Sequence, residues 1–330
     1  GVNGVKDARL SARVVGKQLG LKQSQVAVCS TGVIGLPLPM TRIEPKFSEL
    51  VEGLKRDKSL NVAQAIMTSD TCHKQIAVRV MIDGVPVKIG ACAKGAGMIN
   101  PHMATMLCFV TTDAELSKDA LDKCVSGAVE KSFNRITIDG DMSTNDTVIV
   151  LANGQSGMPV IKRNSKECRQ MREALTYVML KMAKSLVRDG ERVTKFVTVR
   201  VKNARTGPDA KKVAQAVANS QLVKSSWNGN DPNWGRIIHA VGYSGARSKE
   251  EMIDIFYESK PACEGGLQGK TNPEVLRNIV SKPSFTITID LNQLNGLDGR
   301  MTQQLSNGSS ISTAHHQGLF GLWMTTRSGM

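Results

Sequence analysis

The spacing of apolar residues changes repeatedly along the chain between the period of a helix and that of a strand. Apolar residues recur at helical spacing in several stretches that we expect to be helices, at 5–20, 46–57, 117–133, 166–187 and 209–221. Short apolar or alternating stretches predict strands, at 25–30, 76–82, 85–91, 106–110, 136–138, 148–151, 195–202 and 285–291. Asp83-Gly84 lies between two of these strand patterns and predicts a hairpin turn. Because helices and strands are mixed throughout, the fold class is α/β or α+β.

Two parts of the chain stand apart from this pattern. Residues 296–330 are dominated by Gly, Ser, Gln, Thr and His with little periodicity, and we expect loop or disorder there. The chain starts at Gly1 and enters a helical pattern almost at once, so we expect the true N-terminus to lie further upstream. The 330 residues, 41% of them hydrophobic, suffice for one large or two ordinary domains.

Composition narrows the function classes. The formal net charge is +14, but Lys and Arg are scattered and aromatic residues are only 4% of the chain. We therefore expect a solvated basic surface and no nucleic-acid partner. The seven cysteines are odd in number and form no CxxC pair, which indicates free thiols in a reducing compartment. No apolar stretch approaches bilayer length, so we expect no membrane span.

The segment most informative about chemistry is Lys94-Gly-Ala-Gly-Met-Ile-Asn-Pro-His-Met-Ala-Thr105-Met-Leu. Gly95 and Gly97 suggest a phosphate-binding loop, but the Gly-Lys-Ser/Thr ending of a Walker motif is absent. No GxGxxG follows a strand here, so a nicotinamide site is not indicated either. Taken without context, the segment reads as an ordinary loop that enters a buried strand.

A second polar segment, Asp139-Gly-Asp-Met-Ser-Thr-Asn-Asp146, offers several hard oxygen ligands. Such oxygens suit calcium or magnesium, but the spacing is not that of an EF-hand. We therefore expect a polar turn network that supports a site, and no metal.

The Lys94–Leu107 string is similar to the processing segment of the ornithine acetyltransferases (glutamate N-acetyltransferases). The resemblance covers roughly residues 1–290. Other segments resemble the family in the same order, and they are Ser30-Thr-Gly-Val-Ile-Gly35, Met67-Thr-Ser-Asp-Thr71, Ile138-Asp-Gly-Asp-Met-Ser-Thr-Asn-Asp-Thr147 and Gly229-Asn-Asp-Pro-Asn-Trp-Gly-Arg236.

The resemblance implies that the chain cuts itself between Ala104 and Thr105 and then uses Thr105 as its nucleophile. A threonine hydroxyl needs a nearby base. The new α-amine of Thr105 supplies one, since its pKa of about 7.7–8.0 leaves a neutral fraction near pH 7. No catalytic histidine is then required. The family's oxyanion hole falls on Thr31 and Gly32, in a turn where backbone N–H groups can point outward.

The resemblance also implies the residues that bind substrate. Lys94 would contact a substrate carboxylate, Thr71 would donate a hydrogen bond to the same ligand, and Glu191 would pair with the substrate's amino group. The family usually continues after this Glu with Gly-Ala, whereas this chain has Arg192-Val193. The segment 296–330 does not match the family's C-terminal substrate-contacting segment, a departure that affects substrate binding more than self-cleavage.

The implied fold is a two-subdomain α/β architecture of mixed sheets flanked by helices. Residues 1–104 would form one cleaved chain and 105–330 the other, with 105–190 completing the catalytic subdomain and 195–295 forming a second one. The implied reaction moves acetyl from N2-acetylornithine to glutamate in arginine biosynthesis, without cofactor or metal, and acetyl-CoA stays open as a second donor.

We expect the cleaved chains to stay together as an α2β2 assembly in the cytoplasm, or in an organelle matrix in a eukaryote. Two alternatives remain. One is a self-processing amidohydrolase or aminopeptidase, in which water accepts the acyl group. The other is a basic nucleic-acid-binding protein.

Overall fold

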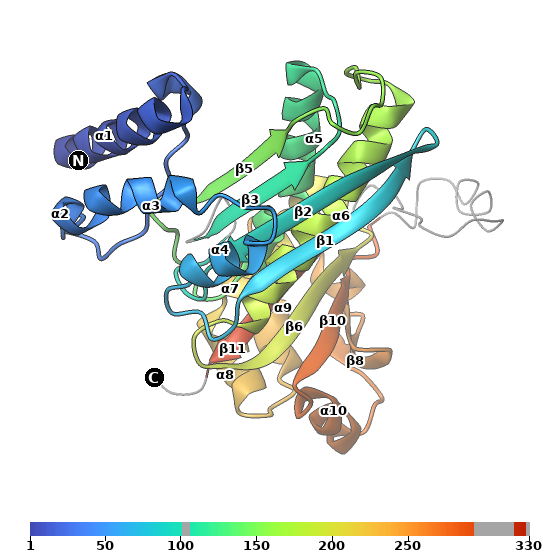
Figure 1. The fold of residues 1–330 in the computed structure, drawn as a ribbon. Coiled ribbons are helices and arrows are strands. Elements are labelled where there is room, and N and C mark those ends of the chain that lie inside the picture. The colour runs from blue at the N-terminus through green and yellow to red at the C-terminus, as the bar shows by residue number, and fades with distance from the viewer. Residues whose placement is uncertain (101–105, 294–319, 328–330) are drawn as a thin grey trace.

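The computed structural model describes residues 1–100 and 106–293 together with a strand at 320–327. It contains a four-stranded sheet and a seven-stranded sheet, each with its own helices (Figure 1). This arrangement confirms the α/β class with mixed sheets flanked by helices.

The four-stranded sheet has the order β1-β2-β3-β5. Its strands are β1 (Lys74–Ile82), β2 (Val85–Lys94), β3 (Leu107–Thr112) and β5 (Thr147–Ala152). β1 and β2 form the expected hairpin, and Asp83 and Gly84 have φ angles of 48° and 79°. Two consecutive positive φ angles are those of the turn that Asp-Gly favours. β3 runs antiparallel to β2 and parallel to β5.

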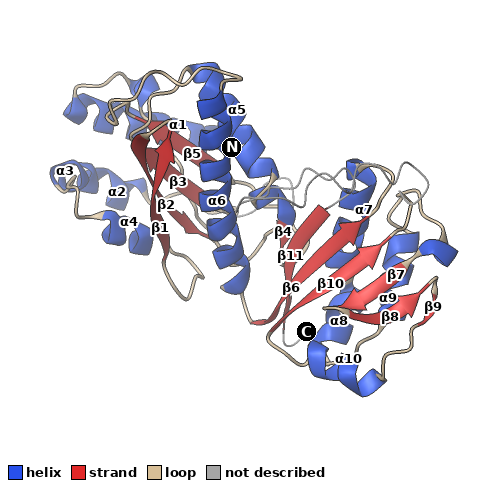
Figure 2. Ribbon diagram, turned by 90° about the vertical axis from the view of Figure 1, so that its right-hand side faces the viewer, coloured by secondary structure: helices blue, strands red, loops and turns tan. Residues whose placement is uncertain are grey.

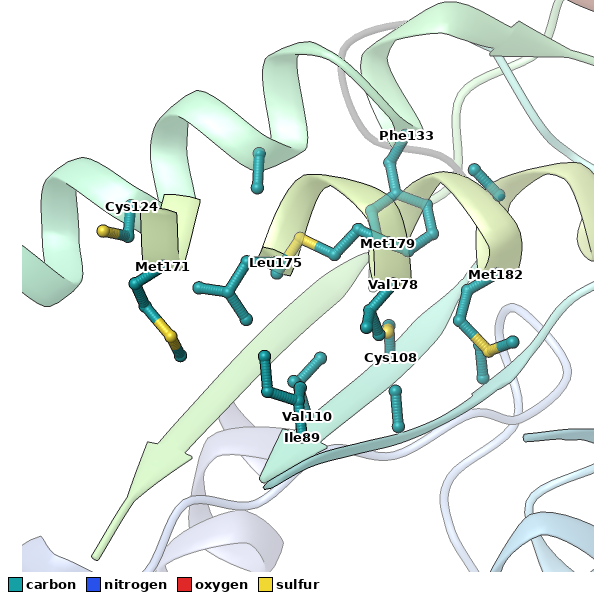
Figure 3. Packing of buried hydrophobic residues seen from close by; sticks show 14 of the residues in the cluster. Ile89, Cys108, Val110, Cys124, Phe133, Met171, Leu175, Val178, Met179 and Met182 are labelled. Carbon is teal, nitrogen blue, oxygen red and sulfur yellow. The ribbon is translucent and has the colours of Figure 1, made fainter. Parts of the chain in front are cut away.

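Two helices cover one face of this sheet: α5 (Lys118–Glu130) and α6 (Lys166–Arg188). Residues of α6 at helical spacing point into the core, among them Met171, Leu175, Val178 and Met182. They pack over side chains of β2 and β3 such as Val110 (Figure 3). Fully burying each such side chain contributes about 1.5–3 kcal/mol. The first core therefore holds α6 firmly against the sheet.

The seven-stranded sheet has the order β4-β11-β6-β10-β7-β8-β9 (Figure 2). Its strands are β4 (Ile136–Thr137), β6 (Val193–Lys202), β7 (Asp254–Tyr257), β8 (Lys260–Glu264), β9 (Leu267–Gln268), β10 (Ser284–Asp290) and β11 (Phe320–Arg327). Four helices pack on it: α7 (Gly207–Asn219), α8 (Gln221–Asn228), α9 (Trp234–Gly242) and α10 (Pro273–Val280). In β6, Val197, Val199 and Val201 are fully buried while Arg200 between them is exposed. The two cores divide along the chain between Phe196 and Val197.

The N-terminal elements lie at the edge of the molecule, beside the first sheet (Figure 1). They are α1 (Val2–Leu19), α2 (Met40–Ile43), α3 (Phe47–Glu52), α4 (Ser59–Ala65) and the 3-10 turns η1 (Gln23–Gln25) and η2 (Glu44–Lys46); two further 3-10 turns, η3 (Phe133–Arg135) and η4 (Glu250–Met252), occur later. Here two predictions were wrong. The strand predicted at 25–30 is absent, because Gln25 ends η1 and residues 26–30 pair with no strand of the described chain. The helix predicted at 46–57 stops at Gly53.

The other differences lie towards the C-terminus. The predicted helices at 117–133, 166–187 and 209–221 and the strands at 195–202 and 285–291 are present with shifts of a few residues. The prediction of an irregular tail was wrong for residues 320–327, because β11 pairs with β6 and β4. In the ranges that the structure describes, no helix is both long and apolar enough to cross a membrane.

Candidate active site

Three strand ends of the first sheet meet at the segment that contains the predicted nucleophile. Lys94 at the end of β2 lies opposite Leu107 at the start of β3, and Leu107 lies opposite Thr147 at the start of β5. The predicted cleavage pair, Ala104 and Thr105, lies outside the described residues. Thr105 is nevertheless bonded to Met106, which is buried and directly precedes β3. The sheet register therefore determines which residues lie around the Met106 amide, the nitrogen of the peptide bond after Thr105.

Asp146 holds that peptide bond. Its Oδ1 accepts a hydrogen bond of 2.8 Å from the Met106 amide, and the Thr147 amide donates to the Met106 carbonyl at 3.0 Å. Its Oδ2 is buried and has no hydrogen-bond partner among the described residues. Burial raises the pKa of this carboxyl to about 6, although the Met106 amide and the Lys94 charge both act to lower it. An ordinary aspartate pKa is about 3.9, so Asp146 is an unusually basic carboxylate.

Lys94 is fully buried, and its Nζ also lacks a hydrogen-bond partner in the described part of the chain. Burial lowers the pKa of this amine, while the nearby charges of Asp70 and Asp146 raise it. A buried ammonium without hydrogen bonds costs several kcal/mol, so stable folds rarely keep one without a ligand. Lys94 is therefore suited to receive an anionic group.

The predicted oxyanion turn lies next to the same strand ends. The Asn145 side-chain amide donates to the Thr31 hydroxyl oxygen at 2.9 Å and to the Ser30 carbonyl at 2.5 Å. Asn145 directly precedes Asp146, so a short path of contacts links Thr31 to the Met106 amide. Gly32 follows Thr31 and is exposed. The predicted turn begins after this pair, because the hydrogen bond from the Leu36 amide to the Val33 carbonyl closes a turn at 33–36.

Glu191 lies against the loop that follows Lys94. Its amide donates to the Ala96 carbonyl at 2.7 Å, and a side chain at Gly97 would come within 2.7 Å of its Oε1. A side chain at 97 would therefore require the Glu191 carboxylate to move from this position. Arg192 has a φ of 53°, a left-handed conformation that favours glycine. The substitution of Arg for the family's usual Gly therefore places a strained residue directly beside Glu191.

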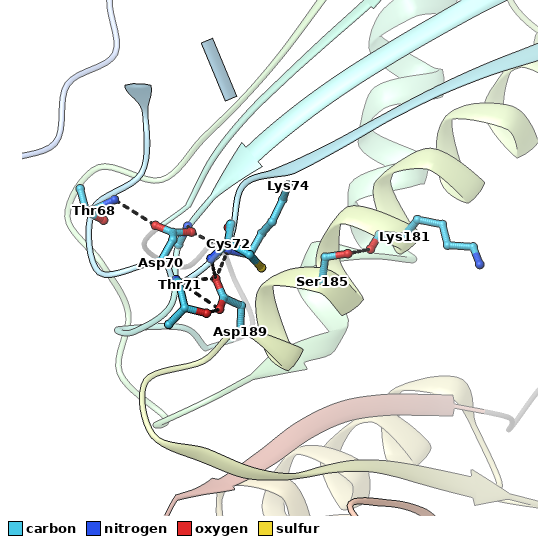
Figure 4. A network of polar contacts seen from close by, with 9 residues as sticks. Thr68, Asp70, Thr71, Cys72, Lys74, Lys181, Ser185 and Asp189 are labelled. Atoms are coloured by element: carbon cyan, nitrogen blue, oxygen red, sulfur yellow. Dashed lines mark hydrogen bonds and ion pairs between the residues drawn. The ribbon is translucent and has the colours of Figure 1, made fainter. Parts of the chain in front are cut away.

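Thr71 belongs to a buried polar network at the C-terminal end of α6 (Figure 4). Its amide donates to Asp189 Oδ2 at 3.1 Å, and its hydroxyl also donates to Asp189. Lys74 bridges Asp189 and Asp70, which is 2.6 Å away, and Asp70 also accepts from the Gly95 amide at 2.7 Å. The Thr71 hydroxyl hydrogen is therefore already donated to Asp189. A ligand that accepts a hydrogen bond from Thr71 would have to break this contact.

The network also sets the charge state of its two aspartates. Burial raises the pKa of Asp70 and of Asp189, but hydrogen bonds from Lys74 and from neighbouring amides outweigh it and lower both below the usual range. Both aspartates are therefore ionised at neutral pH. They attach the segment around Thr71, the loop at Gly95 and the end of α6 to one another.

The acidic loop after β4 is attached to both subdomains. The Asp139 carboxylate accepts hydrogen bonds from the Met98 and Ile99 amides at 2.7 and 2.9 Å. Such contacts are those expected of a polar turn network. Lys224 of α8 donates to the Ile138 carbonyl at 2.6 Å. In α7, the side-chain amide of Asn219 donates to the side-chain oxygen of Asn100 at 3.2 Å. Within the described ranges, no three His, Cys, Asp or Glu side chains gather as a metal site would require.

The structure thus brings Thr31, Lys94 and Glu191 to the strand ends around Met106, the residue that follows Thr105 in the sequence. Thr71 joins them through Asp189, which lies two residues before Glu191. Sequence reasoning missed the parts played by Asp70, Lys74 and Asp189. Asp70 lies inside the matched Met67–Thr71 segment, which was the available signal. Nothing local in the sequence indicates that Lys74 pairs with Asp189 more than a hundred residues away.

Comparisons with known proteins identify the family of this chain. The model of the ArgJ family matches residues 1–308, which extends past the predicted departure at 296. The arginine biosynthesis bifunctional protein ArgJ of Geobacter sulfurreducens is 45% identical over 307 residues, spanning 93% of this chain and 78% of that protein. The glutamate N-acetyltransferase of Methanocaldococcus jannaschii is 47% identical over 257 residues, spanning 77% of this chain and 63% of that protein.

A solved structure is similar as well. The crystal structure of the arginine biosynthesis bifunctional protein argJ of Bacillus halodurans superposes with a TM-score of 0.58 at 30% identity, covering 67% of this chain and 93% of that one. With a family model that matches nearly the whole chain and relatives above 40% identity, this chain belongs to the ArgJ family.

Proposed function

We propose that this chain is a glutamate N-acetyltransferase of arginine biosynthesis, which moves an acetyl group from N2-acetylornithine to glutamate through an acetyl-Thr105 intermediate. The observation that carries the proposal is the buried ammonium of Lys94 at the end of β2, which has no hydrogen-bond partner among the described residues. Both substrates are amino acids with a carboxylate, which is the group that such an ammonium accepts. The names of the relatives support the same reaction.

The reaction proceeds in two halves. In the first, the Thr105 hydroxyl attacks the acetyl carbonyl, the C–N bond breaks and ornithine leaves with a proton. In the second, the amine of glutamate attacks the acetyl ester and frees the Thr105 hydroxyl. The α-amine of the cleaved Thr105 takes and returns the proton in each half.

The surrounding residues have separate tasks in this scheme. Backbone N–H groups of Thr31 and Gly32 stabilise the tetrahedral oxyanion, and losing one such donor costs about 3–4 kcal/mol. Lys94 binds the substrate carboxylate and Glu191 binds the amino group of the substrate side chain. Thr71 contributes through the network that fixes the loop at Gly95.

The proposal needs no cofactor, because the acetyl group rests on Thr105 between the two halves. Acetyl-CoA is a candidate second donor, since it carries the same acetyl group on a better leaving group. We further propose that the cleaved chains remain together as an α2β2 assembly in the cytoplasm or, in a eukaryote, in an organelle matrix.

The test is an assay of purified protein with N2-acetylornithine, with and without glutamate. Formation of N-acetylglutamate that requires both substrates supports the proposal. Thr105→Ala should abolish this product. Thr111→Ala is its matched control, because Thr111 is an exposed threonine of β3, the strand that follows Thr105 in the sequence. Release of free acetate at the same rate with or without glutamate would instead identify a hydrolase and overturn the proposal.

A further inference from the structure

Two of the seven cysteines face each other between the helices that cover the first sheet. Cys124 lies on α5, and Cys168 lies in the first turn of α6. Their sulfur atoms are 3.6 Å apart, and the Cys124 thiol also lies 3.3 Å from the Cys168 carbonyl, to which it donates. Both side chains are buried. The proposed acetyl transfer uses neither thiol, so this contact is independent of that function.

Contacts on either side hold the two sulfurs together. Ser165 is the N-cap of α6, and its hydroxyl accepts from the Cys168 amide at 3.1 Å. Lys123, which precedes Cys124, donates to the side chain of Asn164, which precedes Ser165. Both cysteines belong to the first hydrophobic core. The sulfurs therefore meet at a packed interface between two helices and not in a loop.

A second pair of cysteines shows that closeness in a sheet is not enough. Cys92 of β2 lies opposite Phe109 of β3, and Cys108 lies opposite Ala93. Successive side chains of a strand point to opposite faces of its sheet. The thiols of Cys92 and Cys108 therefore point away from each other and cannot bond.

We propose that Cys124 and Cys168 form a dithiol that a peroxide oxidises to a disulfide, which stabilises the contact between α5 and α6. One thiolate attacks the O–O bond of hydrogen peroxide and becomes a sulfenic acid, and the hydroxide that leaves takes up the thiol proton as water. The sulfur of the other thiol then attacks the sulfenic sulfur, so that the S–S bond forms and the S–O bond breaks with release of water. In total the two thiols lose two electrons and two protons, and the peroxide is reduced to two molecules of water.

The geometry permits the bond, and burial makes its formation slow. Bonded sulfurs are about 2.0 Å apart, so the two atoms need to approach by roughly 1.5 Å, which small side-chain rotations supply. Burial and the neighbouring thiol raise the pKa of Cys124 to about 12. Because the thiolate is the reactive form, little of it is available at neutral pH. The exposed Cys72 is expected to react with peroxide first.

The disulfide would close a long loop of the catalytic subdomain. The chain between the two cysteines contains β4, the acidic loop at 139–146 and β5. Joining the ends of a loop of this length restricts the unfolded chain and so favours the folded one. The oxidised protein should therefore unfold at a temperature higher by at least about 5 °C.

The test treats the purified full-length protein with hydrogen peroxide at pH 8 until the exposed Cys72 is fully oxidised. Free thiols are then blocked, linked peptides are mapped by mass spectrometry, and thermal unfolding is followed before and after addition of dithiothreitol. We expect a peptide that links Cys124 to Cys168 and a rise in unfolding temperature of at least about 5 °C. Dithiothreitol should reverse this rise, whereas it does not repair oxidised methionine, so the reversible part measures the disulfide.

Matched variants assign the effect to this pair. Cys124→Ala should lose both the linked peptide and the reversible rise. Cys263→Ala, which removes a buried thiol of the second core, should keep both. If Cys124→Ala does not fold, the linked peptide in the natural chain still decides. Absence of that peptide, a link between other cysteines, or an unfolding temperature without a reversible rise would overturn the proposal and leave the proposed acetyl transfer untouched.

Discussion

In the described ranges each half of the molecule buries two lysines, and one lysine of the first half differs from the other three. In the second half, Lys195 donates to Asn230 at 2.6 Å and to the Val280 carbonyl at 2.5 Å, and Lys224 donates to the Ile138 carbonyl at 2.6 Å. In the first half, Lys74 is bound by two aspartates. Lys94 alone of these four has an Nζ that is buried without any hydrogen-bond partner among the described residues.

The difference distinguishes lysines that stabilise the fold from a lysine that is able to bind a ligand. A lysine whose hydrogen bonds are all made inside the protein has nothing left for a ligand. Lys94 Nζ and Asp146 Oδ2 are buried atoms of ionisable groups that have no hydrogen-bond partner in the described ranges, although Asp146 Oδ1 accepts from the Met106 amide. Both residues lie at the strand ends beside Met106. Unsatisfied buried charge is expensive, so its concentration at one place indicates that binding and catalysis occur there.

The largest effect is expected at Thr105. Thr105→Ala should leave one uncut chain without transferase activity, because no hydroxyl remains to attack either carbonyl. Thr105→Ser keeps a hydroxyl and should retain partial cleavage and activity. Intact mass and the N-acetylglutamate assay measure both. Normal cleavage in the alanine variant would rule Thr105 out.

The comparison of lysines itself predicts opposite outcomes for two matched variants. Lys94→Met should lower kcat/KM by about a hundredfold, which corresponds to about 3 kcal/mol, while the free energy of unfolding stays the same or rises. Lys195→Met should leave kcat/KM nearly unchanged but cost about 1–3 kcal/mol of stability, because the Asn230 and Val280 oxygens lose their donor. Steady-state kinetics and denaturant unfolding provide the two readouts. Equal effects of both variants on activity would break the distinction.

A smaller effect is expected in the oxyanion turn. Thr31→Ala removes the hydroxyl oxygen that accepts from Asn145 and loosens the turn that presents the backbone donors. We expect kcat to fall about tenfold with KM little changed, because these donors act mainly in the transition state. A change confined to KM would show that Thr31 and Gly32 bind substrate instead.

The pH dependence of stability should have two limbs of opposite sign. The folded pKa of Asp146 is raised, so the folded chain binds more protons than the unfolded chain between about pH 4 and pH 6. Stability should therefore increase by roughly 2 kcal/mol as pH falls through this window. The pKa values of Asp70 and Asp189 are lowered, so their contribution is present above about pH 4 and is lost at lower pH.

Denaturant unfolding at a series of pH values checks both limbs. Asp146→Asn should remove the rise between pH 6 and pH 4 and leave the fall at lower pH. A natural chain whose stability declines steadily from neutral pH downward would contradict the raised pKa of Asp146.

The smallest effect is expected at Arg192. Arg192→Gly should raise the free energy of unfolding by up to about 1 kcal/mol, because glycine relieves the left-handed strain but loses more conformational entropy on folding. Arg205→Gly, at an exposed loop position, is the control. A loss of stability in Arg192→Gly would show that the arginine side chain makes contacts that outweigh the strain.

The sequence predicted long, strongly periodic elements well and short or pairing-dependent ones poorly. α6 was recognised because its apolar residues recur at helical spacing, and the β1–β2 hairpin because Asp83-Gly84 suits its turn. Residues 26–30 look like a strand but have no partner, and β11 becomes a strand because it fits between β4 and β6. Pairing between distant segments is not visible in local periodicity.

The candidate site shows the same limit. Thr31, Lys94 and Glu191 were identified by resemblance, and the structure places them around one set of strand ends. The Lys74–Asp189 pair and the free oxygen of Asp146 depend on the register of the sheet and on burial, which local sequence does not encode. Those features emerge only once the chain is folded.

The central claim is that Thr105, freed by self-cleavage, carries the acetyl group. The most direct test is intact mass spectrometry of purified protein before and after addition of N2-acetylornithine without glutamate. We predict two co-purifying fragments, 1–104 and 105–330, and a gain of one acetyl group on the larger fragment that disappears when glutamate is added. A single uncut chain, a cut at another bond, or an acetyl group on any residue other than Thr105 would contradict the account.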